Sequence, residues 1–564
     1  MQDIQNFTRQ SDKPWLTYYP DGVPADIDFS SSTSLLDLIE ESVNRFANRP
    51  AYSYMGVEVT YAAADKLSRA LCAYLQQLGL RKGDRVAIMM PNIPQYPIAV
   101  AAILRAGLVV VNVNPLYTAR ELQHQLQDSG ARAIIIIENF AATLQQCLAR
   151  TSVSHIVLAS LGDLLGLIKG SMTNLVVRKF KKMVPPFSLP DAVRFNQAIS
   201  HGQRLPQTHV SVDGNDIAVL QYTGGTTGVS KGATLLHRNI LANVLQSELW
   251  YAPATKLIPA NEQPAIVCAL PLYHIFAFTV CMLLAMKTGA KLILIPNPRD
   301  LKAVLTDLSK HTVHVFPAVN TLFNGLVNHP AFGTVDWTKL KLSLGGGSAV
   351  QSAVAKIWLE KTGCAICEGY GLSETSPTAT CNPTTITAYT GTIGVPVPAT
   401  LVKCIGADDR EVPIGTAGEI AIKGPQVMAG YWQRPAETAA VMTADGFFKT
   451  GDIGIMDEYG FFRIVDRKKD MVLVSGFNVY PNEIEDVMAL LPGVMECAVV
   501  GVPDERTGEA VKLVIVKNDP ALTETQIREY CRANLTGYKQ PKLVEFRKEL
   551  PKTPVGKILR RELR

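Results

Sequence analysis

The chain has 564 residues, of which 47% are hydrophobic and 19% are charged, and its formal net charge is +5. This length exceeds what a single hydrophobic core supports, and the composition is that of a folded, enzyme-sized protein, so two or more domains are expected. The small net charge and the lack of an arginine-rich arm exclude nucleic acid as an expected partner.

The first residues, MQDIQNFTRQSDKPW, lack the basic stretch followed by an apolar stretch that marks a secretory signal. Apolar runs elsewhere are interrupted by charge well short of a membrane span. Ten cysteines are scattered along the chain, and the single C-x-x-C pair, Cys364 and Cys367, has no second pair or close histidine to complete a zinc site. We therefore expect a cytoplasmic protein with free thiols.

Residues 85–137 alternate short apolar runs with segments of helical period. Strands are predicted at 85–90, 108–114 and 131–137, with helices at 97–107 and 118–130 between them. Such alternation is typical of right-handed βαβ crossovers in a parallel sheet. Similar strands at 263–274, 290–297 and 311–319 extend the α/β architecture past the middle of the chain.

Residues 164–186 do not fit this alternation. They combine apolar residues with Lys169, Arg178, Lys179, Lys181 and Lys182. A helix lying on an anionic bilayer needs this composition, and an ordinary amphipathic surface helix is also compatible with it. Peripheral membrane contact is therefore one of two interpretations.

Residues 222–232, YTGGTTGVSKG, follow an apolar run and are too small and too rich in hydroxyl groups to build a core. A Walker A loop would need Gly-Lys-Ser/Thr, which no register supplies, and the Rossmann pattern fails at Gly345–Val350 for want of a third glycine. Gly228 to Gly232 match G-x-S-x-G, which makes Ser230 a candidate hydrolase nucleophile, although six loop residues separate this motif from the strand. The alternative is a loop that wraps a polyphosphate with backbone N–H groups, hydroxyls and Lys231.

The sequence pattern changes at two points in the last third of the chain. Beyond Val395 short strands alternate with Gly and Pro turns, which indicates a small β-rich part at about 395–466. A charged stretch at 466–470 precedes a compact series of strands and helices. The expected organisation is an α/β N-terminal domain of layered subdomains at 1–466 and a small, mobile α+β C-terminal domain at 467–564.

Several motifs, in order along the chain, resemble those of the acyl-adenylate-forming superfamily. They are the loop at 222–232, EGYGLSETSP at 368–377, KTGDIG at 449–454, RIVDRKKD at 463–470 and PKTPVGKILRREL at 551–563. Residues 445–469 look like the fatty acyl-CoA synthetase signature, and later segments are similar to bacterial long-chain fatty acid:CoA ligases of the FadD type. Ser373 stands where the superfamily usually has threonine, so a hydroxyl is retained.

The resemblance implies a role for each matching residue. Lys557 would act in adenylation, Glu374 and Thr223 would hold Mg²⁺, and Asp452 and Arg467 would contact the ribose. The full set assigned to the nucleotide is Thr223, Gly224, Gly225, Thr226, Thr227, Gly228, Lys231, Gly345, Gly346, Gly347, Glu368, Gly369, Tyr370, Gly371, Ser373, Asp452 and Arg467. Lys469 would be the hinge, Gly476 would line the coenzyme A path, and Tyr273 and His274 would lie beside the acyl carboxylate.

The implied activity is ATP-dependent conversion of a fatty acid to acyl-AMP and pyrophosphate, followed by thioester formation with coenzyme A, in fatty acid degradation. ATP, Mg²⁺ and coenzyme A are the implied cofactors and co-substrates, and family members lead us to expect a homodimer. A fatty acyl-AMP ligase is the closest alternative, but such proteins are expected to carry an insertion after the hinge that residues 466–485 lack. The serine hydrolase using Ser230 is a second alternative.

Overall fold

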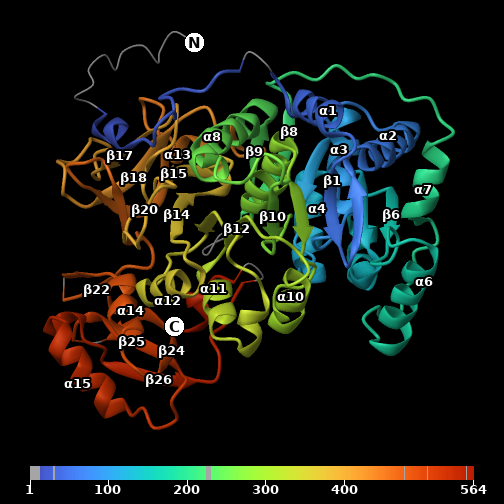
Figure 1. Ribbon diagram of the computed structural model, residues 1–564. Helices are drawn as coiled ribbons and strands as arrows, with labels where there is room; N and C mark the ends of the chain where they lie inside the picture. Colours follow the sequence, from blue (N-terminus) through green and yellow to red (C-terminus); the bar gives the residue numbers. More distant parts are fainter. Residues whose placement is uncertain (1–12, 30–31, 224–229, 476, 505, 554–555) are drawn as a thin grey trace.

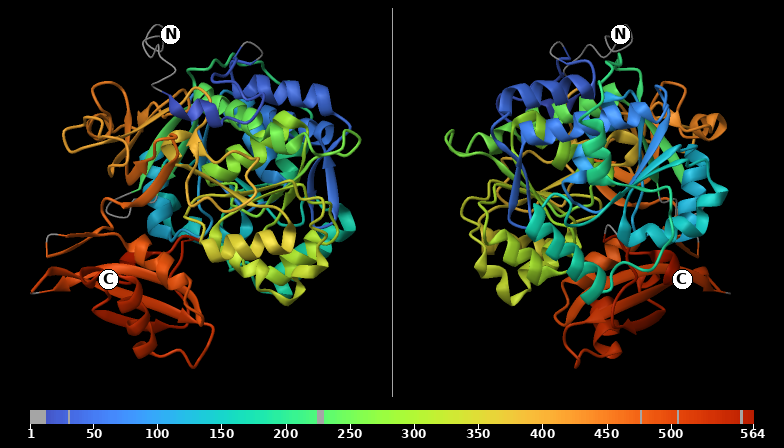
Figure 2. Two further views of the ribbon diagram at one scale, coloured as in Figure 1. Left: turned by 60° about the vertical axis from the view of Figure 1, so that its left-hand side comes forward. Right: turned by 90° about the vertical axis from the view of Figure 1, so that its right-hand side faces the viewer.

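The computed structural model describes residues 13–29, 32–223, 230–475, 477–504, 506–553 and 556–564, and it has a large N-terminal domain and a small C-terminal domain (Figure 1). Two large sheets lie side by side within the N-terminal domain. The small domain lies at one end of the large one in all views (Figure 2). The predicted α/β class is therefore confirmed.

The first large sheet contains the predicted βαβ repeat. Its central strands are parallel. The alternation expected at 85–137 appears as β3 (Arg85–Met89), α3 (Gln95–Arg105), β4 (Val109–Asn112), α4 (Ala119–Ser129) and β5 (Ala133–Ile137). In spatial order the eight strands are β19 (Gly430–Tyr431), β9 (Lys231–Leu236), β8 (Ile217–Thr223), β4 (Val109–Asn112), β3 (Arg85–Met89), β5 (Ala133–Ile137), β6 (His155–Ala159) and β7 (Val193–Arg194). Every residue of β4 and β5 is buried, which explains why these strands are continuous apolar runs.

The second large sheet is parallel in its middle and antiparallel at its ends. Its nine strands in spatial order are β16 (Val395–Pro396), β15 (Thr378–Cys381), β14 (Ile366–Gly371), β13 (Leu342–Gly345), β12 (Val315–Ala318), β10 (Ala265–Cys268), β11 (Lys291–Leu294), β1 (Pro50–Tyr54) and β2 (Val57–Thr60). The carboxyl ends of β13 and β14 hold the glycine-rich segments at 345–347 and 369–371. Ligands of α/β proteins bind at such strand ends.

A third sheet is built mostly from the predicted β-rich part. It contains β17 (Leu401–Ile405), β18 (Gly418–Lys423), β20 (Phe448–Met456) and β21 (Phe462–Arg467), all antiparallel. Two segments of the same region pair elsewhere, because β16 joins the second sheet and β19 joins the first. These two strands connect the region of the third sheet to both large sheets.

The C-terminal domain has a core of its own, which includes Val472, Ile484, Leu513 and Ile527. Its sheet contains β23 (Phe477–Val479), β22 (Val472–Val474), β25 (Gly508–Lys517) and β24 (Val494–Asp504), with β26 (Leu543–Arg547) parallel to β25. Helices α14 (Pro481–Ala489) and α15 (Glu524–Asn534) accompany this sheet.

Helices enclose the two large sheets. They are α1 (Leu35–Phe46), α2 (Tyr61–Gln77), α3 (Gln95–Arg105), α4 (Ala119–Ser129), α5 (Ala141–Cys147), α6 (Leu167–Leu175), α7 (Phe195–Gly202), α8 (His237–Thr255), α9 (Leu284–Thr288), α10 (Leu301–Leu308), α11 (Asn320–Val327), α12 (Ser352–Thr362) and α13 (Pro435–Ala440).

Within the described ranges, no helix is both long enough and apolar enough to cross a membrane. All ten cysteines are free thiols.

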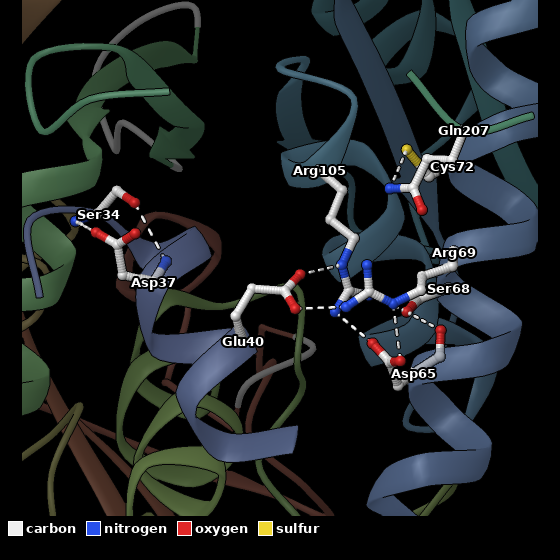
Figure 3. A network of polar contacts seen from close by, with 9 residues as sticks. All are labelled: Ser34, Asp37, Glu40, Asp65, Ser68, Arg69, Cys72, Arg105 and Gln207. Atoms are coloured by element: carbon white, nitrogen blue, oxygen red, sulfur yellow. Dashed lines mark hydrogen bonds and ion pairs between the residues drawn. The ribbon is translucent and has the colours of Figure 1, made fainter. Parts of the chain in front are cut away.

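A buried arginine joins three of these helices (Figure 3). The Arg105 side chain on α3 is 2% exposed, and its guanidinium donates to Glu40 of α1 at 2.9 Å and to Asp65 of α2 at 2.5 Å. Arg69 also bridges Asp65 and Glu40. Because a buried charge is tolerated only when it is paired and hydrogen-bonded, this network fixes how α1, α2 and α3 pack.

Candidate active site

The two strands that flank the glycine-threonine loop form a hairpin in which Thr223 pairs with Lys231. Gly224, Gly225, Thr226, Thr227 and Gly228 lie outside the described residues. Lys231 forms an ion pair with Glu437, and its ammonium lies 5.2 Å from the centre of the Tyr431 ring. A cation is therefore present at the base of the loop, where the sequence predicted one for the phosphates.

Ser230 does not have the surroundings of a hydrolase nucleophile. Its hydroxyl donates a 2.7 Å hydrogen bond to the Thr223 carbonyl oxygen, and the His124 ring contacts the Ser230 carbonyl oxygen at 3.0 Å instead of the hydroxyl. A triad needs the base on the hydroxyl oxygen. The observed contacts instead tie the two ends of the loop together.

Glu374 lies on the short helix η8 (Ser373–Thr375), directly after β14, and its side chain is buried. The hydroxyl of Tyr431 donates to Glu374 Oε1 at 2.8 Å, and the Glu374 carbonyl oxygen accepts from the Met428 N–H at 2.8 Å. The carboxylate is thus held in one orientation by β19. Tyr431 is not among the residues predicted from the sequence, although the aromatic pair in GYW at 430–432 is a weak local signal.

Tyr370 and Asp452 meet although they belong to different sheets. The Tyr370 hydroxyl, on β14, donates to Asp452 Oδ2, on β20, at 2.7 Å. Asp452 is 5% exposed, and its neighbour across β20 and β21 is Arg467, whose side chain lies outside the described part of the structure. Two of the residues predicted to bind nucleotide are therefore in direct contact.

Gly345 ends β13, and the turn that follows it comes close to the aromatic segment at 270–278. A Cβ atom on Gly346 would lie 2.9 Å from the Phe276 ring. On Gly371 a Cβ would lie 1.7 Å from the Pro377 carbonyl oxygen, so only glycine fits there. Close packing of the protein itself therefore requires glycine at these two strand ends.

Glu368 has a structural role that its motif did not reveal. Its carboxylate oxygen accepts a 2.9 Å hydrogen bond from the Val350 N–H, which closes the turn that contains Gly345 to Gly347. Burial raises the pKa of Glu368 to about 8. Glu368 therefore shapes the glycine turn, and its neutral form predominates near pH 7.

The tail that carries Lys557 reaches into the N-terminal domain. The left-handed Gly556 lies against Val319 and Thr321 near the start of α11, and the Lys557 Cε lies 3.7 Å from the Cβ position of Gly347. Burial lowers the pKa of His274 to about 3, and the positive charge of Lys557 contributes to this shift. Lys557, Gly347 and His274 are thus brought together; the family resemblance, which assigned all three to one site, implied this meeting, whereas local sequence pattern does not.

Tyr273 lies beside His274 in the same aromatic segment, and its backbone carbonyl oxygen accepts a 3.1 Å hydrogen bond from Gln221 of β8. Burial raises the Tyr273 pKa above its usual value, so the phenol is neutral. Both side chains of this neighbouring pair are therefore neutral near pH 7.

The predicted hinge residue, Lys469, is exposed in a turn after β21. On the N-terminal side of the hinge, Lys468 pairs with Glu419 of β18 at 3.1 Å. On the C-terminal side, Arg560 pairs with Glu485 at 2.8 Å and approaches Asp466 and Asp470 at 3.9 and 3.8 Å. The tail of Lys557 is thereby tied to the hinge. Gly476, predicted to line the coenzyme A path, lies outside the described residues.

Known protein families and relatives are similar to this chain in sequence. The pattern of the AMP-binding enzyme family matches residues 39–432, and that of the AMP-binding enzyme C-terminal domain matches residues 483–557. A long-chain-fatty-acid–CoA ligase of Salmonella typhimurium is 54% identical over 553 residues, 98% of each chain. A ligase of the same name from Haemophilus influenzae is 51% identical over 98% of each chain.

Solved structures are also similar to this chain. ATP-bound MatB from Rhodopseudomonas palustris matches with a TM-score of 0.78 and 27% identity, covering 94% of this chain and 98% of that one. The anthranilate CoA ligase AuaEII, solved with anthranoyl-AMP, has the same fold with a TM-score of 0.82 over 94% of this chain and 97% of that one. With its motifs, fold and relatives in agreement, the chain belongs to the AMP-binding enzyme family, the acyl-adenylate-forming superfamily that its sequence resembles.

Proposed function

We propose that the protein is a long-chain fatty acid:CoA ligase. It activates a fatty acid with ATP to acyl-AMP and pyrophosphate, and then transfers the acyl group to coenzyme A with release of AMP. The position of Lys557 against Gly347 and His274 carries this proposal, because it brings a cation from the C-terminal domain to the strand ends where a nucleotide would bind. The curated ligases that are 51–54% identical support the choice of acid.

The reaction needs positioning and charge stabilisation rather than a protein nucleophile. An oxygen of the fatty acid carboxylate attacks the α-phosphorus of ATP, the bond to the pyrophosphate oxygen breaks, and the mixed anhydride forms. Lys557 stabilises the negative charge that develops between the carboxylate and the α-phosphate. Because the His274 imidazole is neutral near pH 7, the cation at this point is Lys557.

The residues on the strand ends hold the nucleotide. Asp452, oriented by Tyr370, accepts hydrogen bonds from the ribose hydroxyls, and the adenine lies against Gly345 to Gly347 beside the Tyr370 ring. Lys231 turns from Glu437 to the β- and γ-phosphates, which the loop at 224–229 wraps. Arg467, which follows Asp466 on β21, contacts the ribose or a phosphate.

Mg²⁺ fits the residues at this site. Glu374 supplies a buried carboxylate that Tyr431 holds in place, and Thr223 supplies a hydroxyl, and such hard oxygen ligands are those that Mg²⁺ prefers. Within the described part of the chain, no three His, Cys, Asp or Glu side chains gather to hold a metal. The ion would therefore be shared with the phosphates, whose charge it would neutralise.

Thioester formation requires that Lys557 leave the site, since the tail occupies the approach that the thiol needs. The C-terminal domain, which begins at residue 467, rotates about Lys469 and presents the surface around Gly476 for the pantetheine chain of coenzyme A. The exposed turn at Lys469 can absorb the backbone change. The arrangement described above, with Lys557 beside Gly347, is the one that serves adenylation.

The decisive experiment measures pyrophosphate release and thioester formation separately, with ATP, Mg²⁺, coenzyme A and acids of increasing chain length. A long-chain acid should give both products, and hydroxylamine should trap the adenylate when coenzyme A is omitted. Adenylate without thioester would indicate a fatty acyl-AMP ligase instead. Labelling of Ser230 by a fluorophosphonate, with no pyrophosphate release, would indicate a serine hydrolase.

We further propose that the enzyme works in the cytoplasm as a homodimer in fatty acid degradation, with peripheral contact to the inner face of the cytoplasmic membrane. The basic and apolar segment at 164–186 supports the membrane contact.

A further inference from the structure

An acid from a distant segment holds Lys231 at the base of the glycine-threonine loop. The Lys231 ammonium forms an ion pair with Glu437 of α13, and the two side chains are 39% and 40% exposed. Solvent therefore screens the pair, and ion pairs exposed to this degree contribute little to stability. An anion with more than one negative charge can displace the carboxylate from the ammonium at small cost.

A second cation lies beside Glu437. The Arg434 Nε lies 3.5 Å from Glu437 Oε1, one helical turn away. The same guanidinium donates a 2.7 Å hydrogen bond to Asp128 Oδ1 on α4, and the Asp128 side chain is 14% exposed. Arg434 is therefore anchored independently of Lys231. Glu437 keeps this cationic neighbour when Lys231 turns away.

Asp128 also connects this group of charges to the strand that leads into the loop. Its Oδ2 accepts a 2.7 Å hydrogen bond from the Tyr222 hydroxyl of β8, and its backbone carbonyl oxygen accepts from the Trp432 indole at 3.1 Å. A Cβ on Gly232 would lie 3.1 Å from the Tyr222 ring and 3.5 Å from the Trp432 Cβ, so the hairpin packs closely against this segment. The backbones on both sides of the ion pair are thus fixed, and the exchange of partners needs only side-chain motion.

The segment that contains Glu437 reaches the second charged group of the site as well. The Tyr431 hydroxyl donates to Glu374 Oε1 at 2.8 Å, and the Tyr431 ring faces the Lys231 ammonium at 5.2 Å. Glu437 is therefore a carboxylate placed at the cation that the proposed function assigns to the β- and γ-phosphates. The carboxylate and the phosphates compete for one ammonium.

We propose that Glu437 takes the place of the nucleotide's phosphates in the free enzyme. It holds Lys231 until ATP binds, remains beside Arg434 while Lys231 contacts the phosphates, and takes Lys231 back as pyrophosphate leaves. The inference rests on the proposed function, because it needs a polyphosphate to bind at Lys231. A phosphate chain competes well with one screened carboxylate, and the returning carboxylate lowers the affinity for the product.

The variant Glu437→Gln of the full-length protein tests the competition. Loss of the competing charge frees Lys231, so the Kd of MgATP, measured by titration calorimetry without fatty acid, should fall about two- to fivefold. The KM for ATP should fall with it, and pyrophosphate should inhibit the variant more strongly. A purely structural role predicts the opposite sign, because a disturbed loop would bind ATP more weakly. An unchanged or raised Kd would overturn the proposal.

The variant Arg434→Gln tests the exchange of partners. Glu437 then loses the cation that remains beside it when Lys231 leaves, so the Kd of MgATP should rise about two- to fivefold. Arg434→Lys, which keeps the charge, should restore most of the affinity. In the Glu437→Gln background, Arg434→Gln should leave the Kd unchanged, because the carboxylate is already gone. An equal rise in both backgrounds would overturn the exchange of partners, and thermal unfolding of each variant identifies any general loss of stability.

Glu58 supplies a matched control. It forms an ion pair with Lys291 at 2.9 Å, its side chain is 46% exposed, and it lies on β2 at the edge of the nine-stranded sheet. Glu58→Gln removes the same charge from an exposed ion pair. The affinities for MgATP and pyrophosphate should therefore remain at their wild-type values, and a fall equal to that in Glu437→Gln would overturn the proposal.

Binding and turnover together separate this inference from the proposed function. If the wild type formed acyl-CoA and Glu437→Gln bound MgATP no more tightly than the wild type, the ligase would stand and the competition would fail. If no acid were activated while Glu437→Gln bound MgATP more tightly, the ligase would fail and the competition would stand. A lack of MgATP binding in the wild type and in every variant would overturn both.

Discussion

The Tyr370 hydroxyl donates a 2.7 Å hydrogen bond to Asp452 Oδ2, which connects the end of β14 in the nine-stranded sheet with β20 in the third sheet. The two residues lie far apart in sequence, and they belong to different motifs. The contact fixes the carboxylate that is proposed to accept hydrogen bonds from the ribose.

Tyr370→Phe should weaken ATP binding without affecting the chemical step. The ring that is proposed to face the adenine is kept, and only the hydroxyl that donates to Asp452 is lost. A hydrogen bond to a charged group contributes about 1.5–3 kcal/mol, so the KM for ATP should rise about tenfold or more. Steady-state kinetics with varied ATP test this, with Tyr54→Phe as the control, since the Tyr54 hydroxyl donates to a backbone carbonyl oxygen, that of Leu161, at 3.3 Å. Unchanged KM in Tyr370→Phe would refute the orienting role.

Lys557→Ala should slow adenylation much more than thioester formation. Loss of one preorganised donor at the developing charge costs about 10²–10³ in rate. Single-turnover pyrophosphate release measures the first step, and supplying synthetic acyl-AMP with coenzyme A measures the second. Lys548→Ala removes an exposed lysine nine residues away and should affect neither step. A normal rate of pyrophosphate release in Lys557→Ala would show that Lys557 does not stabilise the transition state.

Lys469→Pro should trap the arrangement in which Lys557 lies beside Gly347. Proline fixes φ, so the turn cannot make the change that domain rotation needs. Adenylation should continue, while thioester formation should fall by about 10²-fold or more. Lys469→Ala, which leaves the backbone free, should keep both half-reactions, and normal thioester formation in the proline variant would contradict the rotating-domain account.

Stability should fall as pH rises from about 4.5 to about 8 because of Glu368. Burial raises the pKa of its carboxyl group from 4.5 to about 8, so between these values the folded protein holds a proton that the unfolded chain has released. The free energy of unfolding therefore decreases with rising pH in this window, by up to about 1.4 kcal/mol per pH unit. Above the folded pKa no further loss arises from this group.

Thermal unfolding across this pH window tests the role of Glu368. Glu368→Gln keeps an acceptor for the Val350 N–H and cannot ionise, so its melting temperature should depend less on pH than that of the wild type. Asp486, whose pKa burial raises to about 6, acts in the same direction at lower pH and remains in the variant. The exposed Glu360→Gln is the control, and an identical pH profile for Glu368→Gln and the wild type would rule out this source of pH dependence.

Gly371→Ala should destabilise the protein strongly. The added methyl group would lie 1.7 Å from the Pro377 carbonyl oxygen, and a backbone atom cannot move aside easily. Overpacking of this kind costs about 3 kcal/mol or more. Gly333→Ala is the matched control, because nothing lies within 4 Å of its added carbon, and it should change stability by less than about 0.5 kcal/mol. Equal denaturation midpoints for the two variants would show that the β14 turn can relax.

The sequence predicted the class of fold, for reasons visible in particular elements. The buried strands β4 and β5 are continuous apolar runs, and the N-cap of α4 is Thr118, with Glu121 completing a capping box. The type and order of these elements can therefore be predicted from the local sequence. The sequence was less informative about which side chains contact the predicted site residues. Tyr431 and Glu437, which contact Glu374 and Lys231, lie outside the motifs, in a segment where the aromatic pair in GYW at 430–432 is a weak local signal.

The sequence by itself determined which chemical groups the protein has and in what order: the donors of the glycine-threonine loop, the acid at 374, the acid at 452 and the lysine near the end of the chain. Only the tertiary structure decided which of them meet, as Tyr370 meets Asp452 and Lys557 meets Gly347, and which face of α6 is left exposed. The physical reason is that local periodicity sets secondary structure, whereas contacts between residues far apart in sequence depend on how sheets and domains pack.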